Sequence, residues 1–192
     1  MLSCLTVVFR FHLFGLALLL CSSCTSPAPA TAPELDAALK AQIEARLVRE
    51  LSPTADREGR QRNAIINRAI DQLYDVTAAP EGYFYQVLDA GAFMPLTEGD
   101  IVTAHYRGNF LDGMEFDNSR KREKPLRFRL GELIPAWNLA LQKAKPGGSI
   151  RILSPSALAY GADGLLGPRG DTLVPAHTVL EFLIDDIRIY EE

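Results

Sequence analysis

The chain has 192 residues, of which 47% are hydrophobic and 23% are charged. This composition is typical of a globular protein and excludes a disordered, highly charged chain. The 20 Lys and Arg residues against 24 Asp and Glu residues give a net charge of −4, which argues against a nucleic-acid partner. All three cysteines (Cys4, Cys21, Cys24) lie in the first 24 residues, so the rest of the chain has no disulfide and no thiol nucleophile.

Residues 1–23 have the pattern of a secretory signal peptide. Arg10 is their only charged residue, and the largely apolar stretch from Phe11 to Leu20 is too short to cross about 30 Å of hydrocarbon comfortably. Ser22 and Ser23 stand directly before Cys24 and resemble a bacterial lipobox, so we expect cleavage before Cys24, its lipidation, and a membrane-anchored protein that faces the periplasm.

Other interpretations of this N-terminus stay open at this point. The segment could act as an uncleaved transmembrane anchor, or as an ordinary cleaved signal with two incidental cysteines. Cys21 is a weaker candidate for lipidation because the bulky Leu20 precedes it.

The mature chain is predicted to begin with a tether and two helices. Residues 24–33 are rich in Thr, Ser, Pro and Ala, and favour an extended linker. Residues 34–79 are predicted to be helical, and Ser52-Pro53 is expected to cap and start the second helix. The apolar positions with helical spacing are Leu35, Ala38, Leu39, Ile43 and Leu47, then Ile65, Ile66, Ala69, Ile70 and Leu73. Such helices serve packing or dimerisation, so a homodimer through them is an expectation, and they are given no catalytic role.

Beyond the helix breakers in residues 77–82, the hydrophobic period changes to two. Alternation predicts strands around residues 102–106, 126–130, 150–152 and 180–185, and the phase restarts after Asp186, which predicts a bulge in the last strand. A short helix is expected from Pro135 to about Lys145, before Pro146-Gly147-Gly148. The predicted fold class is α+β, with a twisted antiparallel sheet wrapped over one short helix.

Five segments of this region then appear in the order found in one known family. The chain resembles the FKBP-type peptidyl-prolyl cis-trans isomerases of the bacterial lipoprotein type over roughly residues 82–192, and residues 80–192 are taken as the isomerase domain. The segments that carry the resemblance are His105-Tyr106-Arg107-Gly108, Asp112 to Ser119 (DGMEFDNS), Leu130 to Trp137 (LGELIPAW), Ala159-Tyr160-Gly161 and Val174-Pro175-Ala176-His177.

The resemblance implies an apolar cleft with Trp137 at its floor. It gives catalytic roles to Tyr106, Asp117, Tyr160 and Phe182. The Ile134 N–H and the Tyr160 hydroxyl would hold substrate carbonyls, while Asp117 would orient the site. The substrate-binding residues that it implies are Phe116, Phe128, Leu133, Ile134, Trp137, Leu173 and Val174. Without the resemblance, each large apolar residue is expected in the core, and Asp117 is expected as a turn or cap residue.

The implied reaction is rotation about the peptide bond before proline, which has a barrier of about 18–20 kcal/mol. It requires no cofactor and no metal, and a dry pocket that fits the twisted amide lowers the barrier. The expected partners are proline-containing polypeptides that are exported and folding, and a macrolide immunosuppressant as a competing ligand. The alternative function is a chaperone or binding module that holds proline-containing segments in the same cleft without efficient turnover.

Several positions depart from the family pattern or invite another chemistry. Ala136 replaces a usual glycine, Leu126 replaces a frequent phenylalanine, and residues 164–173 lengthen a loop at the rim. His105 and His177 have no acidic or cysteine partner at a spacing that suits metal binding, so a metal site is not expected.

Overall fold

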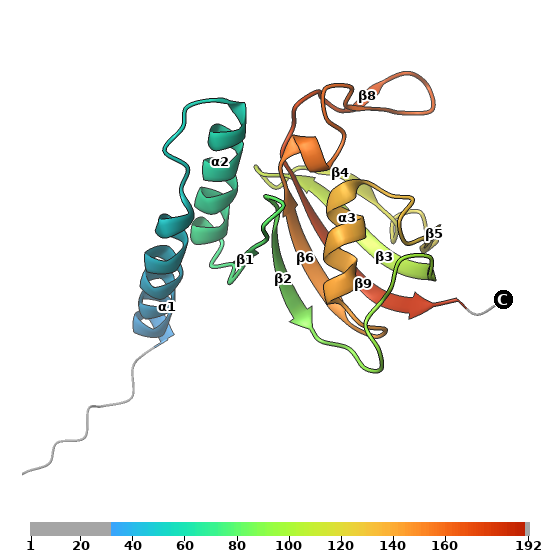
Figure 1. The fold of residues 1–192 in the computed structure, drawn as a ribbon, viewed down its shortest axis with the longest axis horizontal. Coiled ribbons are helices and arrows are strands. Elements are labelled where there is room, and N and C mark those ends of the chain that lie inside the picture. The colour runs from blue at the N-terminus through green and yellow to red at the C-terminus, as the bar shows by residue number, and fades with distance from the viewer. Residues whose placement is uncertain (1–31, 191–192) are drawn as a thin grey trace, which may run out of the picture. The chain divides into compact units, whose positions relative to one another are not determined.

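The computed structural model describes residues 32–190. The predicted signal peptide, the lipidation site Cys24 and residues 24–31 of the tether therefore lie outside the described residues. Within the described part, two helices precede an antiparallel sheet with one short helix against it (Figure 1). The α+β fold class predicted from the sequence is confirmed.

The two N-terminal helices differ in detail from the prediction. The helix α1 (Ala32–Leu47) begins within the expected tether and is followed by the short 3-10 helix η1 (Val48–Glu50). The helix α2 (Arg57–Asp71) has Asp56 as its N-cap, so the predicted cap at Ser52-Pro53 is wrong. The Asp56 carboxylate accepts a 2.7 Å hydrogen bond from the Gly59 N–H, and so satisfies an N–H that the first turn leaves free.

The sheet is antiparallel throughout, in the order β1-β2-β6-β9-β3-β4, with β5 also paired to β3. Its strands are β1 (Thr77–Ala78), β2 (Phe84–Asp89), β3 (Ile101–Phe110), β4 (Glu115–Asn118), β5 (Leu126–Arg129), β6 (Ser149–Ser154) and β9 (Leu180–Ile189). Strands β7 (Leu165–Leu166) and β8 (Thr172–Val174) form a separate hairpin, so the long rim loop has structure of its own.

The predicted bulge in the last strand is confirmed. Thr103 of β3 pairs with Arg188, whereas His105 pairs with Asp185, so two residues of β9 lie opposite Ala104 alone. One of those two residues, Asp186, has a φ of 50°, a left-handed conformation that asparagine and aspartate tolerate better than most residues. The bulge shifts the alternation of β9 and so buries Ile187.

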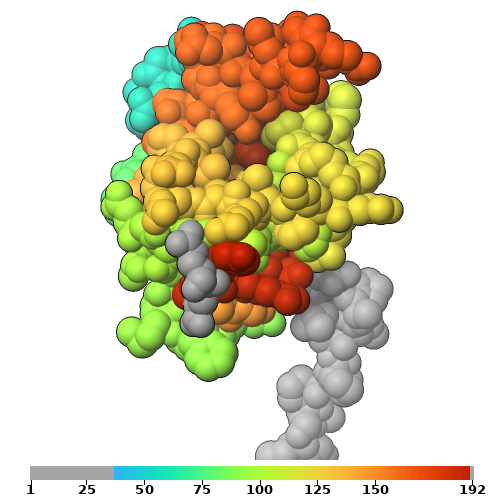
Figure 2. Space-filling model, turned by 90° about the vertical axis from the view of Figure 1, so that its right-hand side faces the viewer, coloured from blue at the N-terminus to red at the C-terminus, as the bar shows by residue number. Residues whose placement is uncertain are grey.

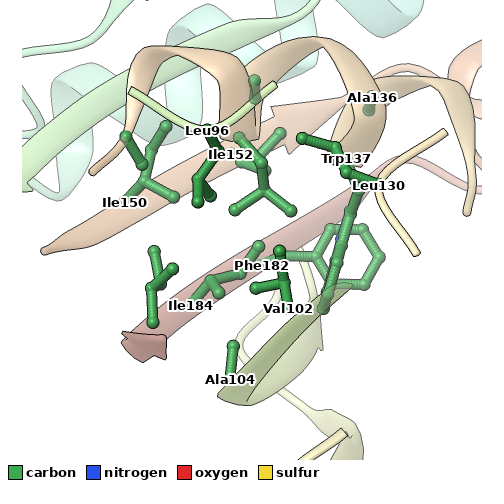
Figure 3. Close-up of a cluster of buried hydrophobic side chains, with 14 of the residues drawn as sticks. Leu96, Val102, Ala104, Leu130, Ala136, Trp137, Ile150, Ile152, Phe182 and Ile184 are labelled. Atoms are coloured by element: carbon green, nitrogen blue, oxygen red, sulfur yellow. The ribbon is translucent and has the colours of Figure 1, made fainter. Parts of the chain in front are cut away.

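The short helix α3 (Pro135–Ala140) continues into the 3-10 helix η2 (Leu141–Lys143) and lies across one face of the sheet (Figure 1). Side chains from β3, β6 and β9 meet the helix there and form the main core (Figure 3). The core side chains that Figure 3 labels are Leu96, Val102, Ala104, Leu130, Ala136, Trp137, Ile150, Ile152, Phe182 and Ile184.

A second core lies on the other face of the sheet, between the sheet and the two N-terminal helices. Successive strand residues point to opposite faces, so Ile152 belongs to the main core and Leu153 to the second one. The second core consists of Ile43, Leu47, Ile65, Ile66, Ala69, Val76, Phe84 and Leu153, all buried. Most of the predicted helical stripe thus packs within this chain, although Leu39 is 43% exposed.

Polar contacts also join α2 to the sheet. The buried Glu181 of β9 accepts hydrogen bonds from Arg68 of α2 and forms an ion pair with Arg151 of β6, with N···O distances of 3.2 and 3.3 Å. The Gln61 side chain accepts a hydrogen bond from the Ser156 N–H, which lies at the start of the 3-10 helix η3 (Ser156–Leu158). Within residues 32–190, no helix combines the length and apolar character that a membrane span requires.

Candidate active site

A small hollow of about 70 Å³ opens where α3, three strands and the loop after η3 meet. In Figure 2 it appears as a recess between the orange and yellow parts of the surface, with dark red β9 at its base. Its lining residues are Tyr106, Leu126, Leu133, Ile134, Trp137, Tyr160 and Phe182. A larger concavity of about 440 Å³ lies between α2 and η3, but its lining contains no aromatic ring other than the imidazole of His177.

Trp137, the only tryptophan of the chain, is 3% exposed and forms the centre of an aromatic cluster. Its ring lies edge-to-face with those of Tyr106, Phe128 and Phe182, at centroid distances of 5.1, 6.0 and 5.4 Å. These are favourable geometries for aromatic pairs. The floor of the hollow is therefore rigid and apolar.

The segment before α3 is held so that one backbone donor stays free. Asn138 of α3 accepts hydrogen bonds from the Gly131 and Leu133 N–H groups, at 3.0 and 3.2 Å, and donates one to the Leu133 carbonyl, at 2.7 Å. Ile134 caps the helix, and Pro135 occupies its first turn without losing a needed N–H. Among the described residues no group accepts the Ile134 N–H, so this donor is available beside Trp137.

A polar network lies at the rim. The Tyr106 hydroxyl donates a hydrogen bond to one carboxylate oxygen of Asp117, and the Arg122 guanidinium is paired with the other. Arg122 also donates a 2.9 Å hydrogen bond to the Tyr106 hydroxyl. Arg122, which lies in the segment between β4 and β5, was not among the predicted site residues. The arginine neutralises the Asp117 carboxylate and fixes it beside the hollow.

Tyr160 supplies a second donor, from the opposite side of the hollow. Burial raises the pKa of its hydroxyl above the ordinary value, so the group keeps its proton. Among the described residues no side chain or backbone group hydrogen-bonds this hydroxyl. The site thus combines an apolar floor, a neutralised carboxylate and two available donors, Ile134 N–H and Tyr160 O–H.

Comparisons with known proteins identify relatives of this chain. The family model of the FKBP-type peptidyl-prolyl cis-trans isomerases matches residues 94–185. The solved structure described as "Crystal structure of AtFKBP13" is similar to this chain, with 31% identity and a TM-score of 0.53. The match covers 95% of the AtFKBP13 chain and 58% of this chain. The chain belongs to the FKBP-type peptidyl-prolyl cis-trans isomerase family.

Bacterial relatives of this FKBP-type chain include larger proteins. FKBP-type peptidyl-prolyl cis-trans isomerase FkpA of Escherichia coli (strain K12) is 43% identical over 100 residues, which are 52% of this chain but only 37% of FkpA. Outer membrane protein MIP of Legionella longbeachae is 36% identical over 101 residues, and 43% of it is covered. The crystal structure of FkpA from Escherichia coli has a TM-score of 0.56 at 29% identity, and covers 83% of this chain and 74% of that one.

The structure of this FKBP-type domain brings most of the predicted site residues together. Phe116 and Phe128 lie behind the hollow, where each contacts one of its wall residues: Phe116 contacts Phe182, and Phe128 contacts Trp137. Phe116 covers Gly108 so closely that a Cβ atom there would lie 2.5 Å from its ring, which explains the glycine of the His105–Gly108 segment. Val174 is buried in the same core.

Leu173 lies away from the hollow. This residue lies in β8 of the rim hairpin and is half-buried, but it belongs neither to the lining of the hollow nor to the core cluster behind it. Strand alternation turns Val174 toward the core and its neighbour away from it. The family pattern alone could not separate these two adjacent apolar residues.

The two histidines have structural contacts. His105 Nδ1 lies 3.0 Å from the hydroxyl of the buried Ser119, and the His177 carbonyl accepts a 2.7 Å hydrogen bond from Gln61. Within residues 32–190, no group of three or more His, Cys, Asp or Glu side chains is placed to hold a metal ion. Asn138 and Arg122 were not among the predicted site residues, and Leu126, which was noted only as a departure from the family pattern, lines the hollow.

Proposed function

We propose that this chain accelerates cis-trans isomerisation of X-Pro bonds in exported polypeptides. The observation that carries the proposal is Trp137, held edge-to-face by three aromatic rings at the floor of a small apolar hollow that has free hydrogen-bond donors at its rim. A proline ring fits such a floor, because it is apolar and compact.

The residues support catalysis by binding rather than by bond making. An X-Pro amide loses resonance as it twists, and the twisted form is less polar than the planar one. An apolar pocket therefore favours the twisted form over the ground state. The Ile134 N–H and the Tyr160 hydroxyl would hold carbonyls on either side of the rotating bond, while Asp117, neutralised by Arg122, would orient the site without the cost of a bare buried charge.

A protease-coupled assay on an Ala-Leu-Pro-Phe peptide tests this function. Acceleration above the uncatalysed rate, and its loss with a macrolide immunosuppressant that competes for the hollow, would support it. Quenching of Trp137 fluorescence by the same peptide reports binding without turnover. Saturable quenching with no acceleration would favour the alternative, a chaperone or proline-binding module that uses the same hollow.

The export and lipid anchoring of the chain are further proposals. The apolar stretch before Ser22-Ser23-Cys24 supports them, as does the similarity to an outer membrane protein of Legionella longbeachae. A fatty-acid probe should label the wild type but not Cys24→Ser, and Cys21→Ser should label normally. Labelling that follows Cys21 instead would overturn the assignment.

Self-association through the N-terminal helices is also proposed. Leu39, Val48 and Leu51 remain 43%, 47% and 38% exposed on α1 and the segment after it, although their neighbours Ile43 and Leu47 are buried. Light scattering after size exclusion should give a dimer mass for the wild type and a monomer mass for Leu39→Glu combined with Val48→Glu.

A further inference from the structure

The charges of the chain are segregated around the hollow. Residues 119–129, here called the basic segment, contain six of the 20 Lys and Arg residues but only one of the 24 Asp and Glu residues. The whole chain has a net charge of −4. A local excess of basic residues thus lies within an acidic protein, in β5 and the segment that links it to β4.

The basic segment is attached to the hollow at three points. It begins directly after β4, which contains Asp117, its Arg122 is paired with Asp117, and its Leu126 lines the hollow. Figure 2 shows this yellow part of the surface as one side of the recess. Lys124 is two residues from Leu126, so their Cα atoms are at most about 7 Å apart. The Lys124 side chain is long enough for its ammonium to come within a Debye length, about 8 Å at physiological salt, of a chain that binds beside Leu126.

Part of this charge is compensated and part is not. Arg120 is paired with Asp185 at 2.5 Å and Lys121 with Glu115 at 2.7 Å, and Arg122 is paired with Asp117. Arg129 forms a longer ion pair with Glu132, at 3.8 Å. Lys124 is exposed, and among the described residues it has no carboxylate within ion-pair distance. The paired side chains of Arg120 and Lys121 remain 58% and 73% exposed, so both can still contact a bound chain.

The opposite side of the hollow differs in charge. The rim hairpin and the turn before it present Asp163 and Asp171, with Arg169 as their only exposed basic neighbour between residues 160 and 174. Of these two sides, only the β4–β5 side has more basic than acidic residues. A chain bound across the hollow would experience this asymmetry, which favours an acidic side chain on one side of the proline.

We propose that the basic segment makes this isomerase selective for proline segments that carry an acidic residue next to or near the proline, with Lys124 and Lys121 as the specificity-determining residues. The proposal rests on the proposed function and names the substrate class for that same hollow. Charges separated by about 8 Å at a protein surface change binding by a few-fold, so we expect acidic peptides to be preferred by about threefold to tenfold.

The test compares peptides that differ only in charge. One set of matched peptides has Glu, Gln or Lys directly before the proline of Ala-Leu-Pro-Phe. A second set has the same three residues directly after the Phe. We measure kcat/KM for each peptide at low salt and again at high salt. In one of the two sets we expect Glu to exceed Gln and Gln to exceed Lys, and the differences to shrink at high salt. Equal values for the three peptides in both sets would overturn the proposal.

Charge-reversal variants assign the preference to the segment. In Lys121→Glu combined with Lys124→Glu, the ratio of kcat/KM for Glu and Gln peptides should fall to about one or below. Lys40→Glu is the matched control, because Lys40 is exposed on α1 and is not part of the site. An unchanged ratio in the double variant would overturn the assignment. A general loss of activity lowers kcat/KM for the Glu and Gln peptides equally, so it leaves their ratio unchanged.

Two further measurements keep the outcome unambiguous. If no peptide is isomerised, the proposed function fails, but Trp137 fluorescence titration with the same peptides still tests the charge preference. Co-sedimentation with vesicles that contain phosphatidylglycerol tests the other anionic partner, a lipid surface. Vesicle binding that the double variant loses, together with no charge preference among peptides, would assign the basic segment to the membrane and overturn the proposal.

Discussion

At Asp117, one carboxylate connects Tyr106 and Arg122 to the rim of the hollow. Replacing it by leucine removes the orienting group and leaves the Arg122 guanidinium without its partner. We expect Asp117→Leu to lower kcat/KM by one to two orders of magnitude, which corresponds to about 1.4–2.8 kcal/mol. A protease-coupled assay measures the change, and circular dichroism checks that the variant is folded.

The size of that loss distinguishes the mechanism from covalent catalysis. Several weak contacts share the stabilisation of the twisted amide, so no single substitution should abolish activity as loss of a nucleophile does. Phe182→Tyr should also reduce activity without abolishing it, because it adds a hydroxyl to a fully buried ring that contacts Trp137. Full activity in a folded variant that lacks both the Asp117 and the Phe182 side chains would contradict the proposed site.

Tyr83 leads to a prediction about alkaline pH. Burial raises the pKa of its hydroxyl to about 12, whereas an unfolded tyrosine ionises near pH 10. The native state therefore keeps a proton that the unfolded state loses, so the free energy of unfolding should be unaffected below pH 10 and fall between pH 10 and 12. The loss is at most about 3 kcal/mol. Urea unfolding at pH 9 and 11 should show a smaller decrease for Tyr83→Phe, while the exposed Tyr190→Phe should behave as the wild type does.

Among the elements, those with a strong periodic pattern were predicted well. The strands around Val102, Ile150 and Phe182 and the bulge after Asp186 follow from alternation, because every second residue of these strands packs into the main core. The start of α2 was not predicted, because Ser52-Pro53 and Asp56 are both plausible caps and only the chain geometry selects Asp56. Arg122 could not be predicted because its role depends on the path of the segment between β4 and β5.

The contact of α2 with the sheet was not predicted either, and it should matter for stability. The Glu181 carboxylate is buried between Arg68 and Arg151, so Arg68→Ala leaves it with one cationic partner. A buried charge left without any partner costs about 3–5 kcal/mol, which is an upper limit here because Arg151 remains paired with Glu181. Arg188→Ala is the control, because its pair with Asp186 is exposed and such pairs contribute less than about 1 kcal/mol. Chemical denaturation should show a large loss for the first variant only.

For the whole molecule, the question is whether the isomerase domain is complete from residue 80 onward. The helical stripes of residues 34–79 are modest, and the sequence alone favours a domain that folds without them. The structure instead places Phe84 and Leu153 under the helices, in a core to which α1, α2 and Val76 contribute. Residues 32–192 also group as one compact unit. A chain that starts at Pro80 would expose both side chains and leave Glu181 without Arg68.

We therefore expect residues 80–192 to be much less stable than residues 32–192. Exposing Phe84 and Leu153 costs about 1.5–3 kcal/mol for each side chain, and the lost ion pair adds to this. The sum is comparable to the whole stability of a small domain, which is about 5–15 kcal/mol. Thermal unfolding followed by circular dichroism should show a much lower Tm or no cooperative transition in the shorter chain. A Tm equal to that of residues 32–192 would show that the second core is dispensable and that the hollow needs only the sheet and α3.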